Sequence, residues 1–140
     1  MRIITPFPAS SGPDAALRLV AERLTKKWSQ TAVIDNKPGG NGFIAMSAFK
    51  QGATDGHDLI QLDSNHITRH PHTFNKLPYD VERDLTPVRM LLRTPFFVAV
   101  GAGSPHKTLD DLIGTAKSQP GKLTYGSWFN GSPGHIGVLR

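Results

Sequence analysis

The chain has 140 residues, enough for a domain with a hydrophobic core, and its 38% hydrophobic content excludes a disordered chain. No stretch has the apolar length of a transmembrane helix, and the absence of cysteine excludes disulfides and thiolate chemistry. Lysine and arginine outnumber aspartate and glutamate by 16 to 11, which favours anionic partners. The positive charges are scattered, with Lys26-Lys27 the densest pair, so nucleic-acid binding has little support.

The first predicted element is a buried strand, because Arg2–Ile4 is an apolar run rich in β-branched residues. A loop of small residues follows, in which Ser11 stands three residues before Asp14, the spacing of a capping box. A helix is expected from about Asp14 to Trp28, with one apolar face: Leu17, Val20, Leu24 and Trp28. The N–H groups at such a helix start attract an anion, although every strand-to-helix connection needs a turn of this kind.

The next elements continue the alternation of strand and helix. Thr31–Asp35 and His57–Leu62 are predicted strands, and Phe43–Lys50 is a predicted helix between them. A β-α-β-α-β order predicts a parallel sheet with helices on its faces. Ligands of such sheets lie beyond the C-terminal strand ends. We therefore expect a cleft along one edge, bordered by three loops: Pro8–Gly12, Asn36–Gly42 and Asp63–His66.

The rest of the chain is less regular. Residues 63–87 are expected to be less regular because three prolines interrupt them. A helix is predicted over Thr108–Ser118, where Thr108 and Asp111 have capping-box spacing, and a strand over Leu123–Ser127. Ser132 is placed to cap a further helix that has only begun at Arg140. We therefore expect this sequence to be the front part of a longer protein.

One motif favours a nucleotide site. Residues Gly40–Ala45 fit G-x-G-x-x-A between a strand and a helix, and Asp63 follows about twenty residues later. However, Asn36–Gly39 separate the predicted strand from the first motif glycine, where the dinucleotide fingerprint turns directly out of its strand. The simpler interpretation is a glycine-rich connection that needs positive φ angles.

Metal binding and catalysis find less support. His66, His70 and His72 are close in sequence, but Pro71 breaks any helical register and no carboxylate pattern accompanies them. The sequence has no nucleophile elbow, no Walker A lysine and no paired carboxylates on one helix. We therefore predict no metal, no cofactor and no enzymatic activity.

A second strand-to-helix loop of small polar residues lies near the end of the chain, within Tyr125–His135. This loop and the one around Pro6–Asp14 could face each other across a cleft and hold a carboxylate. Backbone N–H groups and hydroxyls are sufficient for that role.

Six motifs occur in the order and spacing of one known group: Pro6–Ala9 with Asp14, Asn36–Gly39 with Gly42, Asp55-Gly56, Leu77–Asp80 with Asp84–Pro87, Pro120–Tyr125, and Gly131-Ser132 with His135. In these motifs the whole chain resembles the tripartite tricarboxylate transporter substrate-binding family, also called the Bug family. The resemblance implies an α/β fold like that of type II periplasmic binding proteins, a Venus-flytrap of two lobes. The fold would be incomplete here, with most of lobe one in residues 1–100 and the start of lobe two in residues 101–140.

The resemblance also implies a function. Such receptors are periplasmic, close two lobes around a small organic anion such as a carboxylate, and deliver it to a membrane permease. The matching ligand-binding positions fall in three loops: Phe7, Pro8, Ala9, Ser10 and Ser11; Ser64 and Asn65; and Ser127, Asn130, Gly131, Ser132 and His135. The family usually has glycines where this chain has Ser10-Ser11, and small residues where it has Trp128-Phe129. Aromatic acids are therefore plausible ligands, because bulky rings narrow a cleft or stack on a ring.

Two alternatives stay open. The chain could be a truncated, non-functional remnant of such a receptor, with poorly covered apolar residues such as Leu112 and Ile113 that would make it self-associate. It could also be a nucleotide- or phosphate-binding α/β protein, an alternative that rests on the glycine motif alone.

Overall fold

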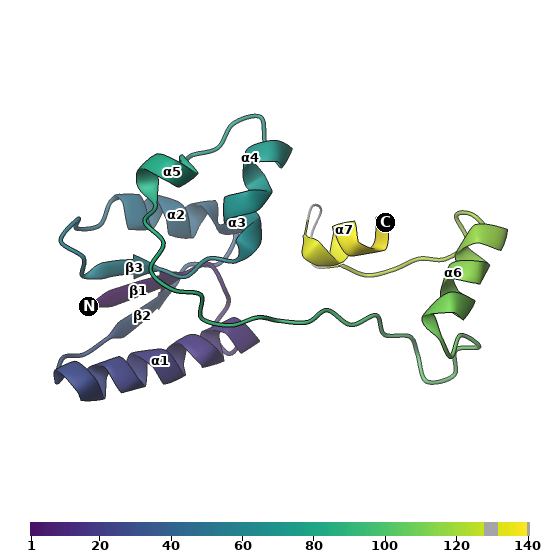
Figure 1. The fold of residues 1–140 in the computed structure, drawn as a ribbon, viewed down its shortest axis with the longest axis horizontal. Helices are drawn as coiled ribbons and strands as arrows, with labels where there is room; N and C mark the ends of the chain where they lie inside the picture. Colours follow the sequence, from purple (N-terminus) through teal and green to yellow (C-terminus); the bar gives the residue numbers. More distant parts are fainter. Residues whose placement is uncertain (128–131, 140) are drawn as a thin grey trace. The chain divides into compact units, whose positions relative to one another are not determined.

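The computed structural model describes residues 1–127 and 132–139, which form two compact units, Met1–Arg93 and Thr94–Arg140 (Figure 1). These units divide before Val100, the residue after which the sequence places the lobe boundary. The correspondence of units to receptor lobes stays a prediction, and each unit is described by itself.

The first unit is built on the predicted parallel sheet, which the structure confirms. Its strands are β1 (Arg2–Thr5), β2 (Val33–Asn36) and β3 (Asp58–Ile60), in the order β2-β1-β3. Both neighbours pair with β1 in parallel, so that Ile3 lies between Ile34 and Leu59. The C-terminal ends of all three strands therefore lie at the same edge.

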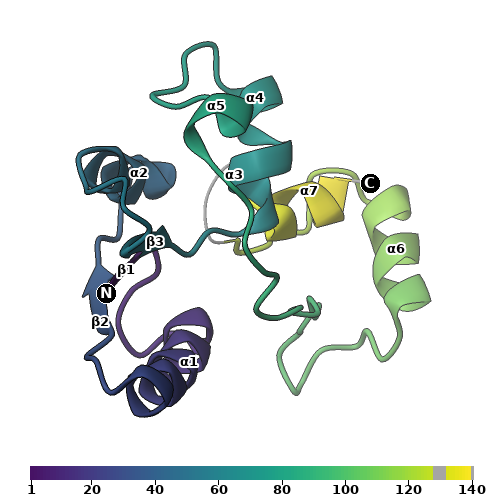
Figure 2. The same cartoon turned by 60° about the vertical axis from the view of Figure 1, so that its left-hand side comes forward.

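Two helices cover opposite faces of this sheet, as Figures 1 and 2 show: α1 (Gly12–Trp28) and α2 (Phe43–Lys50). Ile3 packs with Leu17 and Ala21 of α1. The next residue, Ile4, points to the other face because side chains alternate along a strand. It is fully buried, as are Ala45 and Met46 of α2. The central strand thus supplies core residues to both layers.

Helix α1 begins two residues earlier than the sequence predicts, and only half of the expected capping box forms. The Ser11 hydroxyl accepts the N–H of Asp14, but the Asp14 carboxylate accepts the N–H of Ser10 and not that of Ser11. On the predicted apolar face, Leu17 is buried as expected. Trp28, at the end of the helix, is 49% exposed.

The segment expected to be irregular contains three short helices: α3 (Ser64–Thr68), α4 (His70–Thr73) and α5 (Val81–Asp84). Asp63 and Asp80 cap α3 and α5 through their side chains. One turn of 3-10 helix, η1 (Gly40–Gly42), precedes α2. Gly39, Gly40 and Gly42 all have positive φ angles, as expected for a glycine-rich connection.

The second unit contains α6 (Leu109–Ser118) and α7 (Pro133–Leu139). The predicted capping box between Thr108 and Asp111 is complete, and Ser132 caps α7 by accepting the N–H of His135. The strand predicted over Leu123–Ser127 is wrong. The described residues of this unit include no strand with which it could exchange backbone hydrogen bonds.

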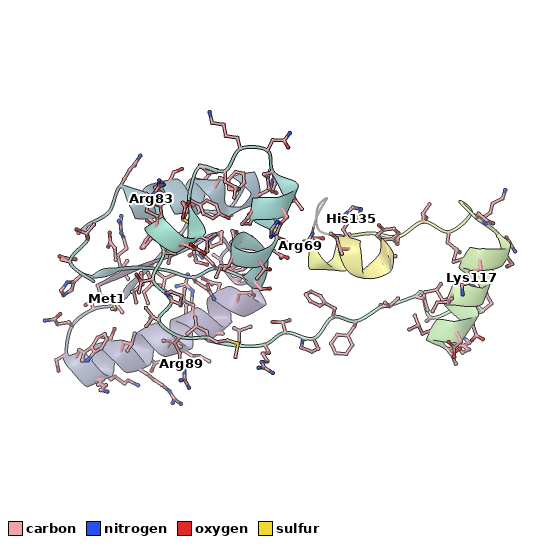
Figure 3. All side chains as sticks on the ribbon, turned by 45° about the horizontal axis from the view of Figure 1, so that its top comes forward. Met1, Arg69, Arg83, Arg89, Lys117 and His135 are labelled. Carbon is pink, nitrogen blue, oxygen red and sulfur yellow. The ribbon has the colours of Figure 1, made fainter. Side chains whose placement is uncertain are left out.

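The basic side chains come from many segments. Figure 3 labels Arg69, which follows α3, Arg83 in α5, Arg89 in the coil after it, and Lys117 in α6. Apolar side chains are exposed on α6, where Leu109 is 59% and Ile113 41% exposed. No helix in the described ranges is both long and apolar enough to span a membrane.

Candidate functional site

Three loops leave the C-terminal edge of the sheet, and the structure confirms that they lie beside one another. The side-chain amide of Asn36, at the end of β2, donates to the carbonyl oxygen of Phe7 after β1 at 3.0 Å. Gly42, before α2, lies so close to the imidazole of His66, after β3, that a Cβ atom would overlap its Nε2. The cleft expected along this edge stays a prediction.

A buried carboxylate organises the first loop. Asp14 has no exposed surface, and its Oδ2 accepts hydrogen bonds from the Ser10 N–H and from Nε of Arg18, each at 2.8 Å. Its Oδ1 accepts the side-chain amide of Asn36 at 2.8 Å. Arg18 also donates to the Asn36 side-chain oxygen at 3.1 Å. These contacts join the loop, α1 and β2.

The same contacts fix the charge of Asp14. Hydrogen bonds from Arg18, from Asn36 and from the Ser10 N–H together lower the pKa of this carboxyl to about 2. Ser10, Arg18 and Asn36 all donate to this carboxylate, so the ionised form satisfies all three. Asp14 is therefore a charged anchor at all physiological pH values.

The hydrogen bonds of the first loop show which of its donor groups already have a protein partner. The N–H groups of Phe7, Ser10 and Ser11 are occupied by the Thr5 hydroxyl, the Asp14 carboxylate and the Pro8 carbonyl. Among the described residues, the N–H groups of Ala9 and Gly12 and the hydroxyl of Ser10 have no protein partner. These three donors lie at the positive end of α1, which attracts an anion.

The third loop adds a buried amide. Asn65 is only 3% exposed, and its Oδ1 accepts a hydrogen bond from Arg69, whereas its Nδ2 has no partner among the residues described. Buried amides are normally paired, so this donor lacks the hydrogen bond that a buried amide usually makes. Ser64, the residue before it, is exposed.

A cluster of aromatic and imidazole rings packs against the turn that contains Asn65 and His66. Tyr79 is buried and donates from its hydroxyl to the backbone oxygen of His66 at 2.6 Å, so the contact of 3.1 Å with Nδ1 of His70 requires His70 to donate. Burial, with a smaller contribution from Asp63, raises the pKa of Tyr79 to about 12. The rings of His66 and His70 lie 4.8 Å apart.

His66 is also held from its other side. Its Nδ1 lies 2.7 Å from the Asp63 carboxylate, which in addition accepts the N–H groups of Asn65 and His66 and so caps α3. Burial acts to raise the pKa of Asp63, but the hydrogen bonds from His66 and Asn65 bring it below its usual value. The Nε2 atom of His66 is buried without a partner among the described residues.

Acid should destabilise this cluster through His70. Burial, and then the neighbouring charges of His66 and Arg69 against the opposing effect of Asp63, lower the pKa of His70 below 6.5. A depressed folded-state pKa means that the unfolded chain binds the proton more readily, so stability is lost as pH falls below about 6.5. We expect a lower melting temperature at pH 5.5 than at pH 7.5. The substitution His70→Gln should flatten this dependence, whereas His72→Gln, at an exposed position, should preserve it.

The predicted residues of the last loop lie in the second unit. The hydroxyls of Ser127 and Ser132 are 2.9 Å apart, and Ser132, which is buried, also caps α7 at His135. The His135 ring stacks on Tyr125, with centroids 6.5 Å apart. Asn130 and Gly131, like Trp128 and Phe129, lie outside the described residues.

The structure thus brings together the predicted residues of the first and third loops at one sheet edge. Sequence reasoning missed the free N–H of Gly12 and the bracing set of Asp14, Arg18 and Asn36. The helix-start signal at Ser11 could have pointed to Gly12, because the first N–H groups of any helix lack intrahelical partners. No group of three or more histidine, aspartate or glutamate side chains in the described ranges is arranged to hold a metal.

The sequence of this chain matches a known protein family and several known proteins. Residues 16–139 match the family described as "Tripartite tricarboxylate transporter family receptor". A UPF0065 protein of Bordetella bronchiseptica is 36% identical over 118 residues, which cover 84% of this chain and 35% of that protein. Protein BugT of Bordetella pertussis is 28% identical over 137 residues, which cover 97% of this chain and 42% of that protein.

Two solved structures are also similar to this chain. The R. palustris protein Rpa4515, solved with adipate, superposes with a TM-score of 0.88 at 31% identity, covering 99% of this chain and 46% of that one. A second structure, described as a periplasmic transporter, has a TM-score of 0.73 at 32% identity, covering 91% of this chain and 43% of that one. These neighbours confirm the predicted α/β receptor fold. The chain spans less than half the length of each of these four relatives.

Proposed function

Because this chain belongs to the tripartite tricarboxylate transporter receptor family, we propose that it forms part of a periplasmic receptor that binds a small organic carboxylate and passes it to a membrane permease. It binds its ligand without chemical change, as expected of a solute receptor. The observation that carries the proposal is a set of donors at the sheet edge that have no partner among the described residues: the N–H groups of Ala9 and Gly12, the Ser10 hydroxyl and the buried Asn65 amide.

These donors suit a carboxylate for a physical reason. An ionised carboxylate accepts several hydrogen bonds and provides no donor, so it matches a site at which each of the four named groups can donate. The α1 N-terminus adds a favourable dipole, and the excess of basic residues attracts anions from a distance. Adipate, the ligand of the R. palustris relative, is a carboxylate of this class and is the first ligand to test.

Titration calorimetry of this chain with adipate, citrate, benzoate and ATP tests the proposal. Binding of at least one carboxylate, without binding of ATP, is the expected result, and ATP binding alone would favour a nucleotide site instead. Benzoate in preference to adipate would place the ligand among ring-bearing acids. A ligand present at 100 times its dissociation constant should also stabilise the fold by about 2.7 kcal/mol.

A matched pair of variants tests the buried amide. The substitution Asn65→Ala should weaken carboxylate binding by about 10- to 100-fold, the usual range for a hydrogen bond to a charged group. Asn75→Ala removes the same amide from an exposed position outside the three loops and should leave affinity unchanged. Equal affinities of the two variants would exclude Asn65 from the site.

A further inference from the structure

Ser10 has a backbone conformation that serine rarely adopts. Its φ angle is 66°, in the left-handed region that costs a non-glycine residue about 1–2 kcal/mol. Ser10 is exposed, so no side-chain packing holds it there. Such a conformation persists only when its surroundings enforce it.

The Asp14 carboxylate is what enforces it. The Ser10 N–H donates to Asp14 Oδ2 at 2.8 Å, and this carboxylate is itself fixed by Arg18 and Asn36. Asn36 also donates to the Phe7 carbonyl and so holds the start of the same loop. The loop is therefore braced at both ends, and the free N–H of Ala9 lies between the two braced residues.

From this arrangement we propose that Asp14 is a positioning residue of the carboxylate site, which acts by holding Ser10 in the left-handed conformation. That conformation sets the directions of the Ala9 and Gly12 N–H groups on either side of Ser10. Asp14 does not touch the ligand. The inference rests on the proposed function, because it concerns the donors of the same site.

A rescue experiment distinguishes this role from a general effect on stability. The substitution Asp14→Asn keeps the side-chain shape but presents an NH2 group or a weaker acceptor to neighbours that are all donors, so Ser10 should relax. Adipate affinity should fall by about tenfold, which corresponds to the free energy that the left-handed backbone conformation of Ser10 costs. Adding Ser10→Gly should restore most of it, because glycine adopts positive φ without a brace.

The chain offers a matched control for the rescue. Ser29, at the C-terminal end of α1, is also left-handed, with a φ of 53°, but lies at the opposite end of the helix from the site. Adding Ser29→Gly to Asp14→Asn should restore no affinity. If Ser10→Gly restores no more than Ser29→Gly does, the proposed role of Asp14 is wrong while the receptor function stands. If the unmodified chain binds none of the carboxylates, both proposals fail.

An NMR measurement without ligand covers the case in which Asp14→Asn does not fold. A positive φ brings the amide proton of a residue close to its own α-proton and gives a strong intraresidue NOE. The unmodified chain should show this NOE at Ser10, and its absence would overturn the proposal. In a folded Asp14→Asn chain the NOE should weaken, and an unchanged NOE would also overturn it.

Discussion

Replacing Gly42 with alanine should lower the free energy of unfolding by about 2–4 kcal/mol. Two costs add at this position. Gly42 has a φ of 82°, which alanine adopts only with strain, and its Cβ would overlap with the His66 ring. The ring cannot move away freely, because Asp63 holds its Nδ1 and Tyr79 holds its backbone oxygen.

Gly40→Ala is the matched control for this prediction. Gly40 also has a positive φ, 54°, but a Cβ there would meet only Ile44, at an ordinary 3.4 Å. We expect a loss of about 1–2 kcal/mol, the backbone cost alone. Urea denaturation of both variants measures the difference, and equal losses would show that the contact between Gly42 and His66 carries no cost.

The substitution Tyr79→Phe should cost about 2–4 kcal/mol, although it removes a single oxygen atom. The hydroxyl serves two buried groups, the His66 carbonyl and Nδ1 of His70, at 2.6 and 3.1 Å. Phenylalanine would leave both without a partner, and each unpaired buried group costs about 1–3 kcal/mol. Thermal and urea denaturation would measure the loss.

The second tyrosine of the chain provides the control. Tyr125 is 49% exposed, and no hydrogen bond of its hydroxyl is found in the described part of the chain. Tyr125→Phe should therefore change stability by less than about 0.5 kcal/mol. If Tyr79→Phe were equally mild, the two hydrogen bonds of Tyr79 would contribute nothing to the fold.

The sheet and the two helices that cover it could be predicted from the sequence because their signals are local. The β-branched run at Arg2–Ile4 and the helical spacing after Ser11 each determine one element without reference to the rest. The short helices α3, α4 and α5 were missed because four or five residues carry too little periodicity. They depend on caps such as Asp63 and on the packing of rings such as Tyr79.

The edge of the sheet at which the three loops lie could be predicted, but the contacts within those loops could not. The loops were placed correctly because parallel strands end at one edge, whereas the partners of each N–H could not be read from the sequence. Asp14 reads as a helix-capping residue, and nothing in the sequence joins it to Asn36, 22 residues away. The strand predicted over Leu123–Ser127 failed for a related reason, because the pattern of a strand does not reveal whether a partner exists.

The position of β1 has a consequence for the order in which the chain can fold. The strand is synthesised before both of its neighbours but is central in the sheet, so it pairs with β2 and with β3, where Asp58 lies 56 residues after its partner Arg2. Until Ile60 has emerged, β1 can pair with a neighbouring strand along only one of its two edges. Contacts that span such a distance in sequence slow folding and leave apolar strands exposed to association. The strand that leads into the first loop of the candidate site therefore keeps one edge unpaired until β3 has been made.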